Sequence, residues 1–195
     1  MDAKNTEKKP ELVVFAGPNG SGKSTFTTPQ WVVGSYINAD DIKRATLCTD
    51  LAAAEKADKL REEMLNAKKD FTFETVLSTD AKLNFMMRAR ENGYFIRGYF
   101  ILTKSPLINI KRIQNRVKKG LHAVPAEKVC SRYVRSLNNL PAFIELCDIC
   151  HVYDNSVQPT RIFRKHKEQE NLYVSTYWTK QKLLCLLYGA EEEDT

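Results

Sequence analysis

Residues 17–24, with the sequence GPNGSGKS, are the stretch that decides how this chain folds. They fit the pattern G-x-x-x-x-G-K-[ST], which forms a phosphate-binding loop when it joins a strand to a helix. The apolar run at residues 12–16 predicts a buried strand directly before the loop, and the loop opens a predicted helix. A glycine turn with an incidental lysine would not need this context. The sequence therefore predicts an anion-binding loop here.

The chemistry expected of the loop follows from its residue types. Glycines let the backbone wrap closely around an anion and aim successive N–H groups at it, and the helix N-terminus adds its dipole. Lys23 is expected to bridge the β- and γ-phosphates of ATP or GTP, and the Ser24 hydroxyl to ligate Mg²⁺. The residues expected to bind the nucleotide are Gly17, Pro18, Asn19, Gly20, Ser21, Gly22, Lys23, Ser24 and Thr25.

Strand-like and helix-like segments alternate along most of the remaining chain. Further strands are predicted at residues 36–38, 71–77, 94–102 and 149–153. Helices are predicted at residues 50–69, 80–92, 106–119 and 125–148, the last of them broken by Pro141. This alternation is typical of an α/β fold with a parallel sheet and right-handed crossovers.

The C-terminal part shows a different pattern. Residues 161–166 and 172–176 predict an antiparallel hairpin around residues 168–171, and residues 183–188 predict a short apolar helix. We therefore expect one domain with a C-terminal extension packed on it. Its expected parts are a disordered tail (1–10), the phosphate-loop domain (11–160), the hairpin and helix (161–190) and an acidic tail (191–195).

The composition is that of a globular protein. The chain has 195 residues, of which 43% are hydrophobic and 28% charged, and this length favours a single domain. It contains no apolar run of about 18 residues, so no membrane partner is expected. Its polar, lysine-rich start lacks the apolar segment of a secretion signal, and its five cysteines fit reduced thiols. These features predict a cytoplasmic protein.

Acidic residues fall at the predicted strand ends, where doubly wound sheets bind their ligands. Asp40 and Asp41 follow the second strand, and Asp154 ends the fifth. We expect Asp40 to face the phosphate site and Asp41 to cap the next helix. Glu74 lies within the otherwise apolar third strand, which is costly unless the carboxylate is functional or paired. An active-site role and a buried ion pair with an arginine are both open for it.

Positive charge is concentrated in residues 104–135. The chain carries a net charge of +6, and this window alone holds nine basic residues against one acidic residue. Arg112, Arg116 and Lys119 have the spacing of one helix face. The window could be a solvated helix surface, or it could attract phosphate groups.

The phosphate loop gives the basic window a more specific interpretation. Phosphoryl transfer spreads negative charge over the γ-phosphoryl oxygens, and arginines from a closing segment stabilise that charge. We expect residues 104–135 to form a basic lid with its tip at 120–125. Arg116 is the first candidate for this role, followed by Arg132 or Arg135.

The order of several motifs resembles that of the zeta-toxin-like P-loop kinases, and in particular their short branch of predicted ATPases. The resemblance covers residues 11–160. The motifs that carry it are GPNGSGKST at 17–25, INADDI at 37–42, ETVLS at 74–78, RV at 116–117, G-x-H-x-VP at 120–125, RY-x-RSL at 132–137 and YDNS at 153–156.

The resemblance implies a nucleoside-kinase-like parallel sheet of five strands and an ATP- or GTP-dependent kinase. The best-known members phosphorylate UDP-N-acetylglucosamine at a sugar hydroxyl, and an antitoxin protein is a further implied partner. The resemblance implies that Asp40 is the catalytic base, that Glu74 and Thr75 hold the acceptor, and that Arg116 and Arg132 are lid arginines. Asn38 departs from the family pattern, which has an aspartate there that can contact Mg²⁺.

Two hypotheses of function follow. The first is a phosphotransferase that moves the γ-phosphate of Mg-ATP to a hydroxyl group of a small molecule, such as a sugar nucleotide. The second is an NTP-binding protein or NTPase that acts on or with nucleic acid, including a polynucleotide 5′-hydroxyl kinase. Aromatic side chains interleaved with the basic residues would favour the nucleic-acid hypothesis, but Tyr133 is the only aromatic residue in the sequence of residues 104–135.

Overall fold

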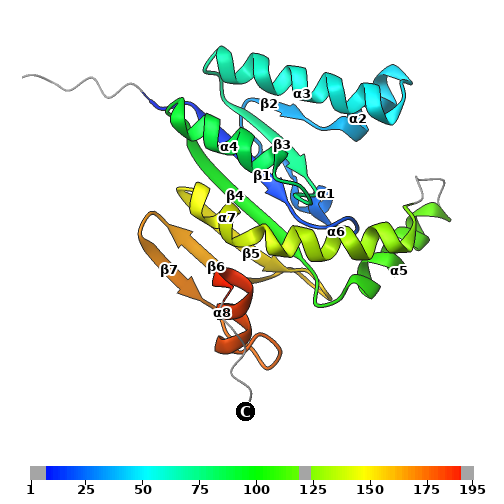
Figure 1. The fold of residues 1–195 in the computed structure, drawn as a ribbon, viewed down its shortest axis with the longest axis vertical. Coiled ribbons are helices and arrows are strands. Elements are labelled where there is room, and N and C mark those ends of the chain that lie inside the picture. Colours follow the sequence, from blue (N-terminus) through cyan, green and yellow to red (C-terminus); the bar gives the residue numbers. More distant parts are fainter. Residues whose placement is uncertain (1–7, 119–123, 190–195) are drawn as a thin grey trace, which may run out of the picture.

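The computed structural model describes residues 8–118 and 124–189, and these form one seven-stranded sheet with helices (Figure 1). The strands are β1 (Glu11–Ala16), β2 (Ser35–Ile37), β3 (Phe71–Thr75), β4 (Phe95–Leu102), β5 (Ile149–Asp154), β6 (Thr160–His166) and β7 (Gln169–Leu172). Their order across the sheet is β2-β3-β1-β4-β5-β6-β7. The first five strands in this order are parallel, and β6 and β7 continue the sheet as an antiparallel hairpin.

The helical segments connect these strands. They are α1 (Lys23–Phe26), the 3₁₀ turn η1 (Pro29–Trp31), α2 (Ala39–Thr46), α3 (Asp50–Asn66), α4 (Ala81–Glu91), α5 (Pro106–Val117), α6 (Ala126–Asn138), α7 (Leu140–Leu146) and α8 (Lys180–Tyr188). In residues 8–118 and 124–189, no helix is long and apolar enough to cross a bilayer.

The crossover connections place nearly all helices on one face of the sheet. A right-handed crossover lies on a face that depends on the direction in which it steps along the sheet. The connections from β2 to β3, from β3 to β4 and from β4 to β5 all step the same way, and only the connection from β1 to β2 steps the opposite way. That connection contains only the short α1 and η1. One sheet face is therefore covered by helices, while the other is covered only in part.

The two faces have hydrophobic cores of very different size. On the helix-covered face, alternate residues of β1, β3 and β4 pack against α3, α4 and α7, and α8 closes the end beside α7. On the other face, the buried cluster among the described residues comprises Val13, Phe15, Tyr99 and Ile101, with Phe26, Val33 and Tyr153 packed against it. Most of the stabilising apolar burial thus lies on the first face.

The predicted α/β fold with a parallel core and a C-terminal hairpin is confirmed. The predicted interruption of the helical segment 125–148 occurs at Asn139, which separates α6 from α7. Pro141 lies in the first turn of α7. The second hairpin strand was predicted wrongly. His166 pairs with Gln169 across a two-residue turn, so β7 begins at residue 169 and not at 172. Lys167, with φ +55°, makes this tight turn, and lysine gives no turn signal in the sequence.

Candidate active site

The phosphate loop lies between β1 and α1, as the sequence predicts. Its glycines are needed for close approach as well as for backbone conformation. A Cβ on Gly17 would lie 2.0 Å from the Ile101 carbonyl oxygen, and one on Gly22 would lie 2.3 Å from Nδ2 of Asn155. Both glycines have φ values, +136° and +98°, that side chains rarely adopt. The loop is therefore packed tightly against the ends of β4 and β5.

The Lys23 ammonium is held by the loop itself. Its Nζ donates to the carbonyl oxygens of Gly17 at 2.7 Å and of Pro18 at 3.0 Å. Burial lowers the pKa of Lys23 to about 8, while the negative charges of Glu74 and Asp40 raise it in part and Arg116 lowers it further. Of these three residues, Glu74 is joined directly to the loop, by the hydrogen bond that it accepts from Ser24 at 3.2 Å.

Glu74 accepts hydrogen bonds from three hydroxyl groups and forms no ion pair with an arginine in the part of the chain that the structure describes. Tyr36 and Thr27 donate to its Oε1, each at 2.7 Å, and Ser24 donates to Oε2 at 3.2 Å. Asn38 extends the network by donating to the Tyr36 hydroxyl oxygen at 2.9 Å. Burial and the neighbouring carboxylate raise the pKa of Tyr36. This network ties the end of β3 to the expected magnesium ligand, Ser24.

The structure corrects the expected cap of α2. The N-cap is Asn38, whose Oδ1 accepts a hydrogen bond from the Asp40 N–H at 2.9 Å. Asp41 does not cap the helix; it lies in the first turn and forms an ion pair with Arg44. The amide at residue 38 thus takes the place that the sequence assigned to Asp41, since asparagine is among the best N-cap residues. The Asp40 side chain is exposed.

The predicted arginines lie on two helices that pack against each other. Arg116 is exposed near the end of α5, and Arg132 is partly buried on α6. Figure 1 shows the two helices side by side next to the phosphate loop. Arg135 is exposed on α6. The expected lid tip at 120–125 falls mostly on residues 119–123, which lie outside the described part of the chain, as does Lys119.

Thr75 and Thr25 occupy less central positions. The Thr75 hydroxyl accepts a hydrogen bond from the Leu77 N–H at 3.0 Å and shapes the turn after β3, where Leu77 has φ +56°. Thr25 is an exposed residue of α1. Thr75 lies next to Glu74 in the chain, and the Thr25 N–H donates to the Gly22 carbonyl oxygen of the loop at 3.0 Å.

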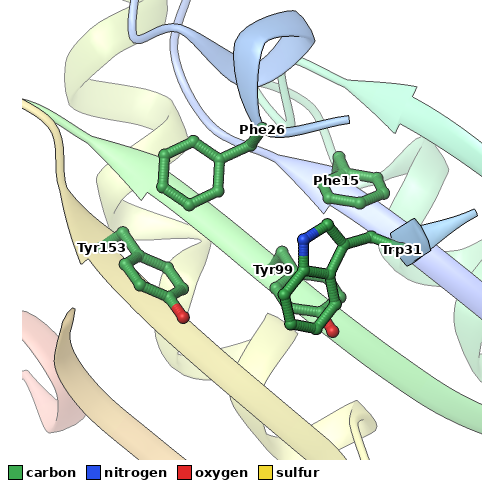
Figure 2. A pocket seen from close by; sticks show the side chains of 5 residues that line it. All are labelled: Phe15, Phe26, Trp31, Tyr99 and Tyr153. Atoms are coloured by element: carbon green, nitrogen blue, oxygen red, sulfur yellow. The ribbon is translucent and has the colours of Figure 1, made fainter. Parts of the chain in front are cut away.

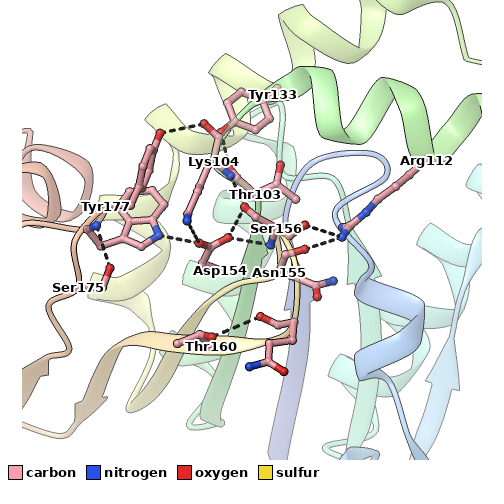
Figure 3. Close-up of polar contacts among 12 residues, drawn as sticks. Thr103, Lys104, Arg112, Tyr133, Asp154, Asn155, Ser156, Thr160, Ser175 and Tyr177 are labelled. Atoms are coloured by element: carbon pink, nitrogen blue, oxygen red, sulfur yellow. Dashed lines mark hydrogen bonds and ion pairs between the residues drawn. The ribbon is translucent and has the colours of Figure 1, made fainter.

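Sequence reasoning missed two residues that hold the phosphate loop in place. Asn155 donates from Nδ2 to the Ser21 carbonyl oxygen at 2.8 Å, and Arg112 donates to the same oxygen at 3.4 Å. Arg112 also donates to the carbonyl oxygens of Asn155 at 2.7 Å and Ser156 at 3.2 Å (Figure 3). Arg112 stood out only as part of the basic window, and Asn155 only as part of the motif YDNS at 153–156. Their common role depends on a contact between distant parts of the chain.

Asp154, the third strand-end carboxylate, is buried and serves the fold. Its Oδ2 accepts from the Trp178 indole N–H at 2.8 Å, and its Oδ1 accepts from the Ser156 N–H at 2.8 Å and the Ser156 hydroxyl at 2.5 Å. Lys104 lies 3.9 Å from Oδ2 (Figure 3). Asp154 thereby anchors the segment that precedes α8 to the end of β5.

The site's donor set fits a magnesium nucleotide. Ser21 is fully buried, yet its hydroxyl has no hydrogen-bond partner within residues 8–118 and 124–189, and it lies inside the loop. Ser24 is the expected metal ligand, with the Glu74 carboxylate next to it. No cluster of His, Cys, Asp and Glu able to hold a metal by itself occurs among the described residues. Mg²⁺ is usually bound by one or two protein groups together with phosphates, and the Ser24 hydroxyl is a group of that kind.

Comparisons with known proteins agree with this geometry. The family model described as Zeta toxin matches residues 34–176, which begin after the phosphate loop. An uncharacterized protein of Haemophilus influenzae is 32% identical over 129 residues, which are 63% of this chain and 92% of that protein. The match spans most of that protein's length, so the similarity is not confined to one motif.

Two solved structures share the fold at low sequence identity. The structure of the PezAT chromosomal toxin–antitoxin system of Streptococcus pneumoniae matches with a TM-score of 0.62 and 15% identity, over 98% of this chain and 83% of that one. The AvrRxo1-ORF1:AvrRxo1-ORF2 complex with sulphate ions matches with a TM-score of 0.66 and 14% identity, over 84% of this chain and 61% of that one. Since the family model covers most of the chain, this protein belongs to the Zeta toxin family of P-loop kinases, which are ATP-dependent phosphotransferases.

Proposed function

We propose that this protein transfers the γ-phosphoryl group of ATP to a hydroxyl group of a small molecule, with a sugar nucleotide such as UDP-N-acetylglucosamine as the first candidate acceptor. The observation that carries the proposal is the hydrogen bond from Ser24 of the phosphate loop to the Glu74 carboxylate, with the charges of Asp40, Glu74 and Arg116 all acting on the loop lysine, Lys23. A phosphate loop alone binds a nucleotide. A carboxylate and a guanidinium beside it are what transfer requires in addition.

The residues have distinct proposed roles. Lys23 leaves the carbonyl oxygens of Gly17 and Pro18 to bind the triphosphate, and the loop N–H groups hold its oxygens. Asp40 accepts the proton of the attacking hydroxyl, and its exposed side chain is accessible to an acceptor. Arg116 stabilises charge on the transferred group. Arg132 is the second candidate for that role.

Ser24 and Glu74 are the proposed support for Mg²⁺. The Ser24 hydroxyl would ligate the ion, and Glu74 would orient it through its hydrogen bond to Ser24. When bound, the ion neutralises charge on the β- and γ-phosphate oxygens. Because Glu74 is held by Tyr36 and Thr27 as well, its carboxylate is fixed before any ligand binds. Its remaining lone pairs, with Thr75 beside it, are the proposed contact for the acceptor.

The nucleic-acid alternative receives no support from the basic window. Its ring, Tyr133, is buried and donates its hydroxyl to the Thr103 carbonyl oxygen at 2.5 Å. A buried ring cannot stack on a base. Polynucleotide 5′-hydroxyl groups stay among the acceptors that the experiment below compares.

The relatives suggest a protein partner as well. The PezAT and AvrRxo1 structures are those of a toxin–antitoxin system and of a two-protein complex. We propose an antitoxin-like partner for this chain, to be sought by co-purification of the native protein.

The test of the proposed function is a transfer assay with γ-labelled ATP on a panel of sugar nucleotides, nucleosides and RNA 5′ ends. We expect Asp40→Ala to lower transfer by about 10²- to 10⁴-fold while ATP binding stays nearly unchanged, because a base acts on the acceptor. Asp41→Ala is the matched control, since it removes the neighbouring carboxylate of the same helix turn. Equal turnover in the Asp40 variant would remove this residue from the mechanism.

A further inference from the structure

The sheet face opposite the main helices carries an unusual set of side chains. Strand β5 alternates strictly, with Cys150, Val152 and Asp154 buried on the helix-covered face. Its other side chains, Ile149, His151 and Tyr153, are only partly buried. The strands β4, β5 and β6, all fully described, present no Asp or Glu to this second face.

Aromatic rings form a row across this face. Residues that pair in register share a face, so Phe15, Tyr99 and His151 lie side by side on β1, β4 and β5. Their ring centroids are 5.0 and 5.3 Å apart, and neighbouring rings are nearly parallel. Trp31 packs edge-on against Tyr99 at 5.2 Å and is 41% exposed.

The aromatic row continues toward the phosphate loop. The rings of Phe15, Phe26, Trp31, Tyr99 and Tyr153 surround a cavity of about 30 Å³, as Figure 2 shows. Such a volume holds no more than a water molecule, so it cannot admit a base or a sugar. What this face offers is the outer surface of its rings, above all that of Trp31.

Cations border the rings on the side of β6. Arg164 pairs in register with His151, and Arg161 pairs with Tyr153 beyond a bulge. Neither Arg164 Nε nor Arg161 Nε has a hydrogen-bond partner in the part of the chain that the structure describes. The Arg161 guanidinium lies 4.9 Å from the centre of the Tyr173 ring.

The positive charges on this face are close enough to act on one another. Burial and the charges of Arg161, Arg164, Arg97 and His166 lower the pKa of His151 to about 4. Among these cations, Arg97 is the one with a carboxylate partner within residues 8–118 and 124–189, namely Glu11 of β1 at 2.8 Å. The charges of Arg161 and Arg164 make this face attractive to anions.

We propose that this face, defined by Trp31, His151, Tyr153, Arg161 and Arg164, binds single-stranded RNA. Arg161 and Arg164 lie three residues apart on β6, which spaces them about 10 Å along the strand, so they match successive phosphates of a chain better than a single small anion. The exposed Trp31 ring, together with the partly exposed rings of His151 and Tyr153, suits bases that stack, whereas an acidic protein would leave the rings unused. A duplex hides the faces of its bases, which favours a single strand.

The proposed surface is separate from the phosphate loop. Arg161 and Arg164 belong to β6, which lies beyond β4 and β5 from β1, the strand that leads into the loop. RNA binding at this surface does not depend on the proposed kinase activity. The two can therefore be tested one at a time.

The first test is fluorescence anisotropy with a labelled single-stranded RNA of about 15 nucleotides, without ATP. We expect salt-dependent binding, and we expect R161Q/R164Q to lower the affinity by about tenfold or more and to reduce the slope of log K against log salt by about 1.4. K56Q/K59Q is the matched control, because it removes two exposed charges from α3 on the other side of the sheet. The control should keep the wild-type slope.

The second test uses the tryptophans. Trp31 is exposed and Trp178 is buried, so RNA should quench the emission of the wild type but not that of Trp31→Phe. Trp31→Ala should lower the affinity by about tenfold through lost stacking, with the salt slope unchanged. This exposed position also gives a reliable variant in case R161Q/R164Q fails to fold, which circular dichroism would reveal.

Four results would overturn the proposal. The first two are an absence of RNA binding at roughly 50 mM salt and wild-type affinity in both R161Q/R164Q and Trp31→Ala. The third is equal affinity for duplex RNA. The fourth is loss of RNA binding in Lys23→Ala, which would place the RNA at the phosphate loop. Binding of polyglutamate but not RNA, dependent on Arg161 and Arg164, would assign the face to an acidic protein instead.

Discussion

At the scale of single residues, the phosphate loop is held in shape before a nucleotide arrives. Its lysine binds two carbonyl oxygens of the loop, and its Ser21 carbonyl oxygen is bound by Asn155 and Arg112. The loop residues and Glu74 could be found in the sequence because a short motif and a carboxylate within a strand are local signals. Asn155 and Arg112 could not, since Ser21 and Asn155 are 134 residues apart along the chain.

Asn155→Ala should loosen the loop and weaken ATP binding. The substitution removes the donor to the Ser21 carbonyl oxygen, and a lost hydrogen bond of this kind costs about 1 kcal/mol. Calorimetry with ATP and urea unfolding measure the two effects. Gln158→Ala, an exposed change in the same connection between β5 and β6, is the control and should alter neither. Unchanged ATP affinity in Asn155→Ala would show that the loop keeps its shape without this bond.

ATP binding should take up protons near pH 8. The pKa of Lys23 is lowered from 10.5 to about 8 in the free protein, so about half of the molecules have a neutral lysine at that pH. The phosphates favour the charged form and raise this pKa, so binding adds a proton to the neutral fraction. Below about pH 7 the lysine is already charged and the uptake should vanish. Calorimetry in buffers of different ionisation enthalpy measures it.

Lys23→Met provides the comparison for this proton uptake. Any ATP binding that remains in the variant should be independent of buffer near pH 8. An equal uptake in wild type and variant would assign the proton to another group.

At the scale of elements, strands and long helices were predicted well and short connections were not. The apolar runs of β1 and β4 and the periodicity of α3 are local features, so their positions follow from the sequence. The N-cap of α2 was predicted wrongly because aspartate and asparagine are equally good N-cap residues, and the structure uses Asn38 instead of Asp41. Likewise, β7 was placed three residues too late because the turn at Lys167 has no glycine or asparagine.

Asn38→Ala should therefore destabilise the fold more than Asp41→Ala. Loss of an N-cap costs about 1 kcal/mol, and Asn38 also donates to the Tyr36 hydroxyl in the Glu74 network. Asp41 loses only an exposed ion pair with Arg44, worth about 0.5 kcal/mol or less. Urea unfolding of both variants ranks them. The reverse order would restore Asp41 as the cap.

At the scale of the whole molecule, the C-terminal extension is part of the same folded unit as the phosphate-loop domain. The hairpin continues the sheet, α8 packs beside α7, and Trp178 binds Asp154 at the end of β5. The parallel core and the antiparallel hairpin after it were predictable from the pattern of strands and helices. The anchoring of the extension was not, because Asp154 reads as a ligand-binding carboxylate when only its position at a strand end is known.

Trp178→Phe should lower the stability of the entire chain and not only that of α8. The variant leaves the buried Asp154 Oδ2 without its indole donor, which costs about 1–3 kcal/mol. Thermal unfolding followed at several wavelengths should show one transition at a lower Tm. Trp31→Phe, at an exposed ring, is the control. A separate early transition would instead show that residues 173–188 unfold on their own.

The two outermost strands bear on how another protein could attach to this one. Strand β2 has three residues and β7 has four, so each border of the sheet offers only a few free backbone N–H and C=O groups. A partner that adds its own strand needs a longer row of such groups. A protein that regulates this kinase is therefore expected to recognise side chains on its helices or sheet face, and copies of the chain should resist joining border to border at high concentration.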